Sequence, residues 1–279
     1  RTCLNDAVPM TLGQEFSGYR EMIKRCREAI AASQKSWAKG ILGATSVGTG
    51  MGIMPGYIPA VYKHLSEVFG TKMEPDKNFF DGMQNCDGFL HLSGLLKMLA
   101  QAVSKIAIDM RILSSGPRAG FGEITIPAVQ PGSSIMPGKI NPVMPELVIQ
   151  VSQQIAGNDA AVTVACQMGE LEISPWEPVV MKNVMEAFEL LINSIPLFTE
   201  KCIKGIVPNR EIALDYAEKS TSLATMISAL MGYKAGSKVA KAAYAEGLSV
   251  KEIVLREKIL TPDQADEIFD LITLTVIDK

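Results

Sequence analysis

One apolar pattern limits the folds open to this chain. Helical periodicity predicts a single long helix over residues 79–115. Within it, apolar side chains alternate steps of four and three along the chain: Leu92, Leu96, Leu99, Val103, Ile106, Met110 and Leu113. Such a heptad seam needs a partner helix along its whole length. The seam therefore predicts a bundle of long helices and argues against a solitary exposed helix.

Composition favours the same class. Hydrophobic residues make up 47% of the 279 residues and aromatic residues only 6%, a profile more typical of packed helices than of a β-sandwich. The length suits one large or two ordinary domains. We expect an all-α fold in which residues 1–206 form a long-helix bundle. Residues 207–279 are expected to form a small helical domain, with the boundary near residues 204–208.

Further periodic stretches predict the other helices. Before the boundary they cover residues 11–39, 59–70, 146–157, 158–168 and 179–203. The stretch 158–168 is apolar on nearly all sides, which predicts an interior helix surrounded by others. After the boundary we expect shorter helices at 209–231, 234–246, 250–258 and 262–271. Two of these begin with capping boxes, formed by Ser249 with Glu252 and by Thr261 with Gln264.

Charge and residue counts exclude several classes of partner. A net charge of −3 gives no strong attraction to nucleic acid or to an anionic membrane. The least charged run, residues 142–169, still contains Glu146 and Asp159 and is too polar for a membrane span. Five scattered cysteines without a CxxC pair indicate reduced thiols, and hence a cytoplasmic protein. Two isolated histidines do not make a histidine-rich zinc site.

A glycine-rich passage at residues 40–56 invites a nucleotide-binding interpretation. Gly43 and Gly48 have the spacing of a P-loop, but Thr49 stands where that motif needs lysine. No predicted strand precedes the passage, so the dinucleotide fingerprint fails as well. Two interpretations stay open, a structural loop and a loop beside an active site.

The richest chemistry lies in residues 132–142, GSSIMPGKINP, which contain no carboxylate. Gly132 and Gly138 allow this segment to bend sharply or to act as a hinged lid. Its polar groups suit a small anionic substrate. Composition alone also allows a plain turn between two helices.

This segment closely resembles the signature loop of the aspartase/fumarase superfamily of lyases. Residues 6–16, DAVPMTLGQEF, resemble the aspartase form of a second family segment, and residues 113–120, LSSGPRAG, resemble a third. The resemblance runs from residue 1 to near the C-terminus. The chain opens at Arg1, inside a family motif, and lacks the Ser-Ser-rich loop that family members carry earlier. We therefore expect that an N-terminal part of the protein is missing from it.

The resemblance implies a mechanism and roles for the loop. Family members remove a proton from the carbon next to a carboxylate and expel a leaving group from the neighbouring carbon. Ser133 corresponds to the general base, and backbone N–H groups around Gly132 and Ser134 are expected to stabilise its alkoxide. The expected substrate-binding residues of the loop are Ser134, Met136, Lys139 and Asn141, with Ser134 equally interpretable as a turn hydroxyl. No cofactor is needed, and activation by a divalent metal stays open.

Two more positions follow from the resemblance. Thr2 matches a substrate-contacting threonine, and Cys3 stands where relatives carry histidine or glutamine. Glu146 matches the acid that pairs with that histidine. Without the imidazole, a proton relay through Glu146 does not form, and Glu146 is then a helix cap. The absence of histidine weighs against hydration more than against loss of ammonia.

The sequence therefore predicts an ammonia-lyase of the aspartase type that converts L-aspartate to fumarate. By resemblance, it acts as a homotetramer whose active sites are each shared among three subunits. Residues 6–16 and 168–172 favour aspartase over fumarase. The alternatives are a fumarate hydratase, a lyase for another succinate-derived amino acid, and a non-catalytic helical assembly subunit.

Overall fold

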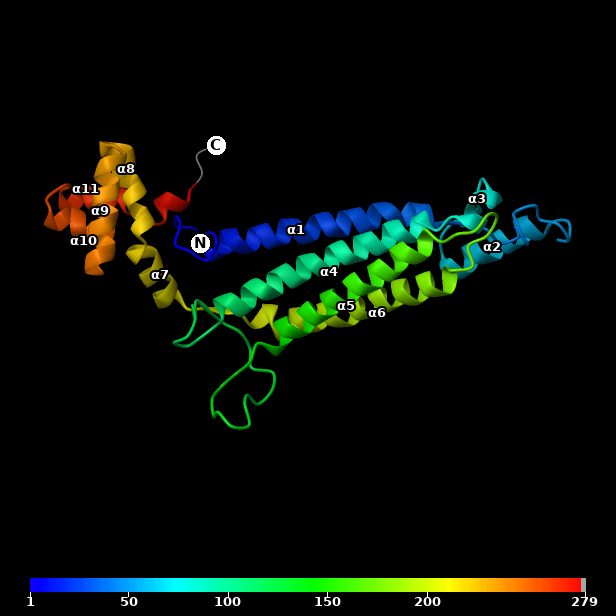
Figure 1. The fold of residues 1–279 in the computed structure, drawn as a ribbon, viewed down its shortest axis with the longest axis horizontal. Helices are drawn as coiled ribbons and strands as arrows, with labels where there is room; N and C mark the ends of the chain where they lie inside the picture. The colour runs from blue at the N-terminus through cyan, green and yellow to red at the C-terminus, as the bar shows by residue number, and fades with distance from the viewer. Residues whose placement is uncertain (277–279) are drawn as a thin grey trace. The chain divides into compact units, whose positions relative to one another are not determined.

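A computed structural model describes residues 1–276 and is built almost entirely of helices, which confirms the predicted all-α class (Figure 1). The chain divides into two compact units. The long-helix unit comprises Arg20–Ile112 and Ile126–Ile206. The tail unit comprises Arg1–Tyr19, Leu113–Thr125 and the chain from Val207 on. The division into domains 1–206 and 207–279 stays a prediction.

The helices and strands have the following bounds. The first half of the chain contains α1 (Leu12–Ser33), η1 (Gln34–Trp37), β1 (Lys39–Gly40), α2 (Tyr57–Phe69), β2 (Glu74–Pro75), α3 (Phe79–Gln84), α4 (Asp87–Leu113) and β3 (Ile124–Thr125). The second half contains α5 (Val143–Cys166), α6 (Glu177–Lys201), η2 (Ile203–Gly205), β4 (Val207–Pro208), α7 (Arg210–Lys219), η3 (Thr221–Leu223), α8 (Ala224–Met231), α9 (Tyr233–Glu246), α10 (Val250–Arg256), α11 (Pro262–Ile268) and η4 (Thr273–Thr275). Strands β1 and β2 pair in parallel, and β3 and β4 pair antiparallel.

The core of the long-helix unit lies between α4, α5 and α6, which run alongside one another (Figure 1). The heptad seam of α4 is buried, as predicted: Leu96 is 2% exposed and Met110 is fully covered. Facing side chains come from Ile155 of α5 and Val180 of α6, both almost fully buried. The seam therefore has the partner helices that its spacing requires.

The helix predicted over residues 79–115 is interrupted, so that prediction is wrong at one point. Asn85 has extended backbone angles and ends α3, and α4 begins two residues later. The Asn85 amide group donates a hydrogen bond to the Asp81 carboxylate at 2.6 Å, and its backbone N–H bonds the Asp81 carbonyl. Asn85 therefore completes the last backbone bond of α3, while its own extended backbone stops the helix from continuing.

The predicted helices 146–157 and 158–168 are instead one continuous helix, α5. Gly157 has no positive φ and does not break the helix. Within one chain, residues 158–168 are not enclosed on all sides, because Val164 is 56% exposed, and burial of this stretch against helices of other copies stays a prediction. The apolar flank of this stretch therefore faces outward from the long-helix unit.

The tail unit has its own core, formed by α8, α9, α10 and α11. Ile227, Val250 and Ile253 are completely buried there. Both predicted capping boxes are present, with each N-cap hydroxyl and each N3 side chain bonded to the other residue's backbone N–H. The predicted helix 209–231 is divided at Ser220, whose extended backbone separates α7 from η3 and α8.

A charged pair lies inside the long-helix unit. The Asp159 carboxylate on α5, 8% exposed, pairs with the Lys97 ammonium on α4. It also accepts a hydrogen bond from the Ser93 hydroxyl at 2.8 Å. A buried carboxylate is tolerated only when it is paired and hydrogen-bonded, so these contacts tie α4 to α5 at one register.

We predict an asymmetric response when this pair is broken. Lys97→Met leaves the buried Asp159 carboxylate unpaired and should lower the free energy of unfolding by roughly 2–3 kcal/mol. The double variant Lys97→Met/Asp159→Leu should recover much of that loss, because no buried charge remains. Urea unfolding at a fixed protein concentration measures both values. Lys204→Met, which breaks the exposed pair with Glu200, is the control and should barely move the midpoint. A double variant no more stable than Lys97→Met would contradict this account.

Candidate active site

The loop of residues 132–142 lies directly before α5 and folds back on itself. The Ser133 N–H donates to the Lys139 carbonyl at 3.2 Å, and the Lys139 N–H donates to the Met136 carbonyl at 3.3 Å. At Gly132 the backbone passes so close that a Cβ atom would lie 1.3 Å from the Lys139 carbonyl oxygen. Gly138 has a φ of 80° and turns the chain. The two glycines are therefore needed for different reasons, close approach at one and backbone rotation at the other.

The hydroxyl of Ser133 is the best-organised polar group of this loop. Its Oγ accepts the backbone N–H groups of Ile135 at 3.2 Å and of Met136 at 3.1 Å. The two N–H dipoles favour negative charge on that oxygen. We expected donors from the neighbourhood of Gly132 and Ser134. The Ile135 N–H, directly after Ser134, lies in that neighbourhood, and the Met136 N–H lies one residue further along. Residue spacing does not identify these two N–H groups, because they depend on how the loop bends back.

The rest of the loop is open to solvent. Ser134 and Lys139 are exposed, Met136 is 51% exposed, and Asn141 is half-buried at the beginning of α5. Ile135, 85% exposed, is an apolar side chain left uncovered at the tip. A loop that presents both polar groups and an apolar tip is suited to close over a bound molecule.

Glu146 lies in the first turn of α5, where a carboxylate is favoured by the exposed N–H groups of the helix end. Its Oε1 lies 3.8 Å from Nη2 of Arg111, in the last turn of α4. Both side chains are partly exposed. Sequence reasoning missed Arg111, because nothing in its local pattern points to Glu146. The predicted role of Glu146 as relay or cap stays a prediction.

Thr2 and Cys3 belong to the tail unit, whereas Ser133, Ser134, Met136, Lys139, Asn141 and Glu146 all belong to the long-helix unit. Thr2 and Asn5 exchange two backbone hydrogen bonds of 3.0 Å, which makes residues 2–5 a tight turn. Cys3 is exposed at the tip of this turn. The turn holds Cys3 where a small molecule or a reagent can reach it.

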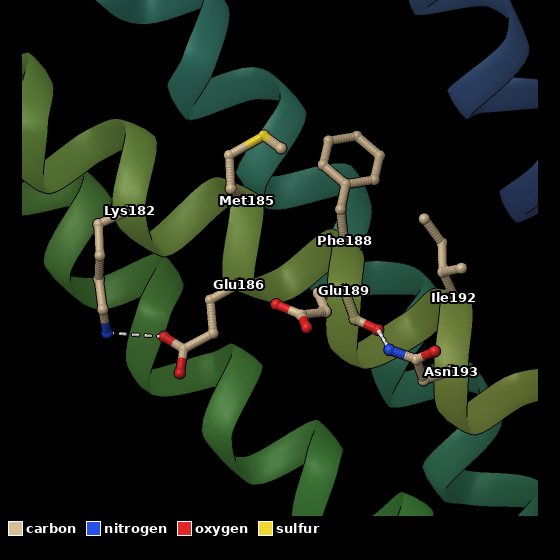
Figure 2. A pocket seen from close by; sticks show the side chains of 7 residues that line it. All are labelled: Lys182, Met185, Glu186, Phe188, Glu189, Ile192 and Asn193. Carbon is tan, nitrogen blue, oxygen red and sulfur yellow. Dashed lines mark hydrogen bonds and ion pairs between the residues drawn. The ribbon is translucent and has the colours of Figure 1, made fainter.

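A hollow lies along one flank of α6, and Figure 2 shows the side chains that line it. Its lining comes entirely from this helix: Lys182, Met185, Glu186, Phe188, Glu189, Ile192 and Asn193. Lys182 Nζ lies 2.7 Å from Glu186 Oε2, and the hydrogen bond from Lys182 lowers the pKa of that carboxyl. With its one cation already paired and a second carboxylate at Glu189, this hollow does not suit a dicarboxylate. Exposed Met185 and Ile192 instead suit the packing of another helix.

Among residues 1–276, no three histidine, cysteine, aspartate or glutamate side chains gather in a group fit to hold a metal ion. Within the same residues, no helix combines the length and the apolar character needed to cross a bilayer.

Comparisons with known proteins show which proteins this chain is similar to. A family model described as "Lyase" matches residues 1–157, and one described as "Fumarase C C-terminus" matches residues 223–276. An aspartate ammonia-lyase of Bacillus sp is 42% identical over 275 residues, 99% of this chain and 59% of the relative. A class II fumarate hydratase of Corynebacterium efficiens is 41% identical over 286 residues, the whole of this chain and 60% of the relative.

A solved structure shows the same fold. The crystal structure of a fumarate lyase:delta crystallin from Brucella melitensis, bound to cobalt, has a TM-score of 0.94 and 38% identity. The match covers 99% of this chain and 60% of that one. The chain thus spans about three-fifths of the length of the proteins it matches.

We predict that the close approach of residues 132 and 139 requires glycine at position 132. Gly132→Ala places a methyl group against the Lys139 carbonyl and should break the hydrogen bond from the Ser133 N–H. Amide exchange at Ser133 should then become faster. Gly138→Ala is the matched control: its added methyl meets no atom within 4 Å, so only the strain of positive φ remains. Equal exchange at Ser133 in both variants would refute a special requirement at Gly132.

Thiol chemistry should single out Cys3. Burial raises the pKa of the Cys202 thiol to about 11, and burial together with the neighbouring Cys86 thiol raises that of Cys166 to about 11. Near pH 7, iodoacetamide should therefore label the exposed Cys3 first, because thiolate is the reactive form. Peptide mass spectrometry checks the order, with Cys3→Ser as control. Rapid labelling of Cys202 would contradict this description.

The same pKa shifts predict a loss of stability in alkali. The ordinary thiol pKa is 9.0, so the unfolded chain releases these two protons near pH 9. The folded protein keeps them to higher pH, because the pKa of both thiols is raised to about 11. The stabilisation is therefore complete below about pH 9 and is lost as pH rises toward 11. Denaturant unfolding over this range should show a smaller decline for Cys166→Ser/Cys202→Ser than for the parent protein. Identical declines would show that these thiols do not contribute.

Proposed function

This chain belongs to the lyase family whose model matches residues 1–157, and from that premise we propose that the complete protein is an aspartate ammonia-lyase. It converts L-aspartate to fumarate and ammonia. The observation that carries the proposal is that the Ser133 hydroxyl oxygen accepts hydrogen bonds from two backbone N–H groups. Identity of 42% to an aspartate ammonia-lyase over 99% of the chain supports this choice of substrate.

In the proposed reaction, Ser133 acts as the general base. Its Oγ, as alkoxide, takes the proton from the substrate carbon next to one carboxylate. The electrons of that C–H bond first collect on the carboxylate and then form the double bond of fumarate, as the C–N bond breaks and ammonia leaves. The N–H groups of Ile135 and Met136 lower the energy of the alkoxide.

The intermediate carries two negative charges on one carboxylate and needs donors in place before it forms. Lys139 supplies a positive charge and Asn141 a directional N–H donor from the same loop. Ser134 and Met136 line the loop around the substrate, and closure of the loop keeps water from the carbanion. Thr2 and Cys3, whose roles follow from the resemblance, are proposed as further substrate contacts. No cofactor takes part, and a divalent metal acts at most as an activator.

A fumarate hydratase is the second candidate, because a class II fumarate hydratase is 41% identical to the chain. Cys3 in place of an imidazole disfavours it, since adding water calls for a histidine–glutamate relay. Action on another succinate-derived amino acid, and a non-catalytic assembly role, are the remaining alternatives.

We further propose a cytoplasmic homotetramer with active sites shared among three subunits. Exposed apolar side chains on the bundle helices support burial against other copies. Met185 and Ile192 of α6 are 57% and 66% exposed, and Val164 of α5 is 56% exposed (Figure 2 shows Met185 and Ile192). Large apolar surface on long helices is typical of interfaces between subunits.

The base assignment predicts a specific loss of turnover. In the complete gene product, Ser133→Ala should lower kcat for L-aspartate by about 10³-fold, within the range expected when a general base is removed. Thermal stability should change little, because the loop is exposed. Fumarate absorbance measures the rate. Ser17→Ala is the control and should retain most of the activity, since it removes an exposed hydroxyl of α1 outside the loop. Turnover in Ser133→Ala equal to that in Ser17→Ala would remove Ser133 from the role.

A further inference from the structure

The turn at residues 2–5 has an unfavourable backbone. Cys3 and Leu4, its two central residues, have φ values of 53° and 59°. Positive φ at both central positions is the requirement of a type I′ turn, which normally selects asparagine or glycine. Neither cysteine nor leucine adopts this conformation readily. Within the turn, the Thr2–Asn5 backbone bonds and a 3.0 Å bond from the Asn5 side-chain amide to the Cys3 carbonyl oppose this strain. Contacts outside the turn add to them.

The Arg1 side chain supplies one such hold. Its guanidinium pairs with the Glu123 carboxylate and lies over the Phe121 ring, 4.9 Å from the ring centroid. Arg1 immediately precedes the turn, and its side chain is only 26% exposed, whereas that of Glu123 is 14% exposed. The planar guanidinium can pair and stack at once, which a lysine ammonium cannot do.

The segment that receives Arg1 is itself fixed. The Glu123 N–H donates to the Leu113 carbonyl at 2.9 Å, and the Glu123 carbonyl accepts the Asn209 N–H at 2.8 Å. The Tyr216 hydroxyl donates to the Phe121 carbonyl at 3.2 Å. Arg1 therefore contacts a segment of the same unit that is itself fixed by hydrogen bonds.

The turn is also held on its other side. The Ala7 carbonyl accepts hydrogen bonds from the hydroxyls of Ser220, at 3.1 Å, and Ser222. Both serines belong to the connection between α7 and α8. The segment of residues 1–7 is thus fastened at both ends, with the strained turn between the two fastenings.

We propose that Arg1 is a positioning residue for substrate binding. Its contacts with Glu123 and Phe121 keep the turn in its strained form, and the turn in that form presents Thr2 and Cys3. Arg1 does not itself touch the substrate. The predicted effect of Arg1 on substrate affinity rests on the proposed function. The effect of Arg1 on the stability of the turn does not depend on that function.

The kinetic test uses the complete gene product. Arg1→Gln should raise KM for L-aspartate by about 10- to 100-fold, the factor by which the competent turn becomes less populated. It should change kcat far less, because Ser133 and its donors are untouched. Arg1→Lys should fall between Arg1→Gln and the parent protein. Arg256→Gln breaks another arginine–carboxylate pair of the tail unit, with Glu246, and serves as the control with KM unchanged.

A rescue variant separates positioning from general destabilisation. Leu4→Gly removes the penalty for positive φ at one of the two central residues, so the turn should remain largely formed without the contacts of Arg1. Arg1→Gln/Leu4→Gly should therefore return KM to within about threefold of the parent value. Replacement of a merely structural arginine would not be corrected by a glycine in the neighbouring turn. A KM that stays high in the double variant, or that never rises in Arg1→Gln, overturns the inference.

Amide exchange gives a readout that needs no substrate. The N–H groups of Thr2 and Asn5 are bonded within the turn and should exchange faster in Arg1→Gln, and return toward the parent rate on adding Leu4→Gly. An unchanged rate in Arg1→Gln overturns the inference whether or not the protein turns over aspartate. If the parent protein does not turn over aspartate, the proposed function is contradicted. Faster exchange in Arg1→Gln would still show that the contacts of Arg1 keep the turn formed.

Discussion

Burial of the α4 seam against α5 and α6 is the interaction on which the long-helix unit depends. Side chains such as Leu92 and Leu96 are almost completely covered, and each contributes about 1.5–3 kcal/mol of hydrophobic stabilisation. Such gains offset the entropy lost when long helices become ordered. Since α5 is fixed within this core, so is its first residue, Val143. The loop of residues 132–142 is therefore attached at its C-terminal end to a rigid element.

The chemistry lies outside that core. The loop is mostly exposed, and its shape comes from backbone bonds within it and from a close approach at Gly132. The hydroxyl of Ser133 gains its donors from the loop's own N–H groups rather than from a distant helix. Active sites commonly place reactive groups on loops held by a rigid scaffold, and this division allows loop motion without loss of fold.

Periodic and local signals in the sequence predicted much of this structure. The seam of α4 and the capping box at Ser249 depend only on spacing, and both are present. The break at Asn85 was missed because the apolar pattern continues through it. The contact of Glu146 with Arg111 was not foreseen, since it depends on how the backbone folds back. Backbone N–H donors to Ser133 were expected, but the sequence did not identify which N–H groups they are. The roles assigned to Thr2 and Cys3 came from resemblance alone.

The most direct test of the central claim is a parallel assay on the purified complete gene product. Fumarate formation would be followed from L-aspartate and from L-malate under identical conditions. Our account predicts fumarate from aspartate, with release of ammonia, and none from malate. Fumarate from malate alone would contradict it, because it would show that hydration proceeds with Cys3 in place of an imidazole.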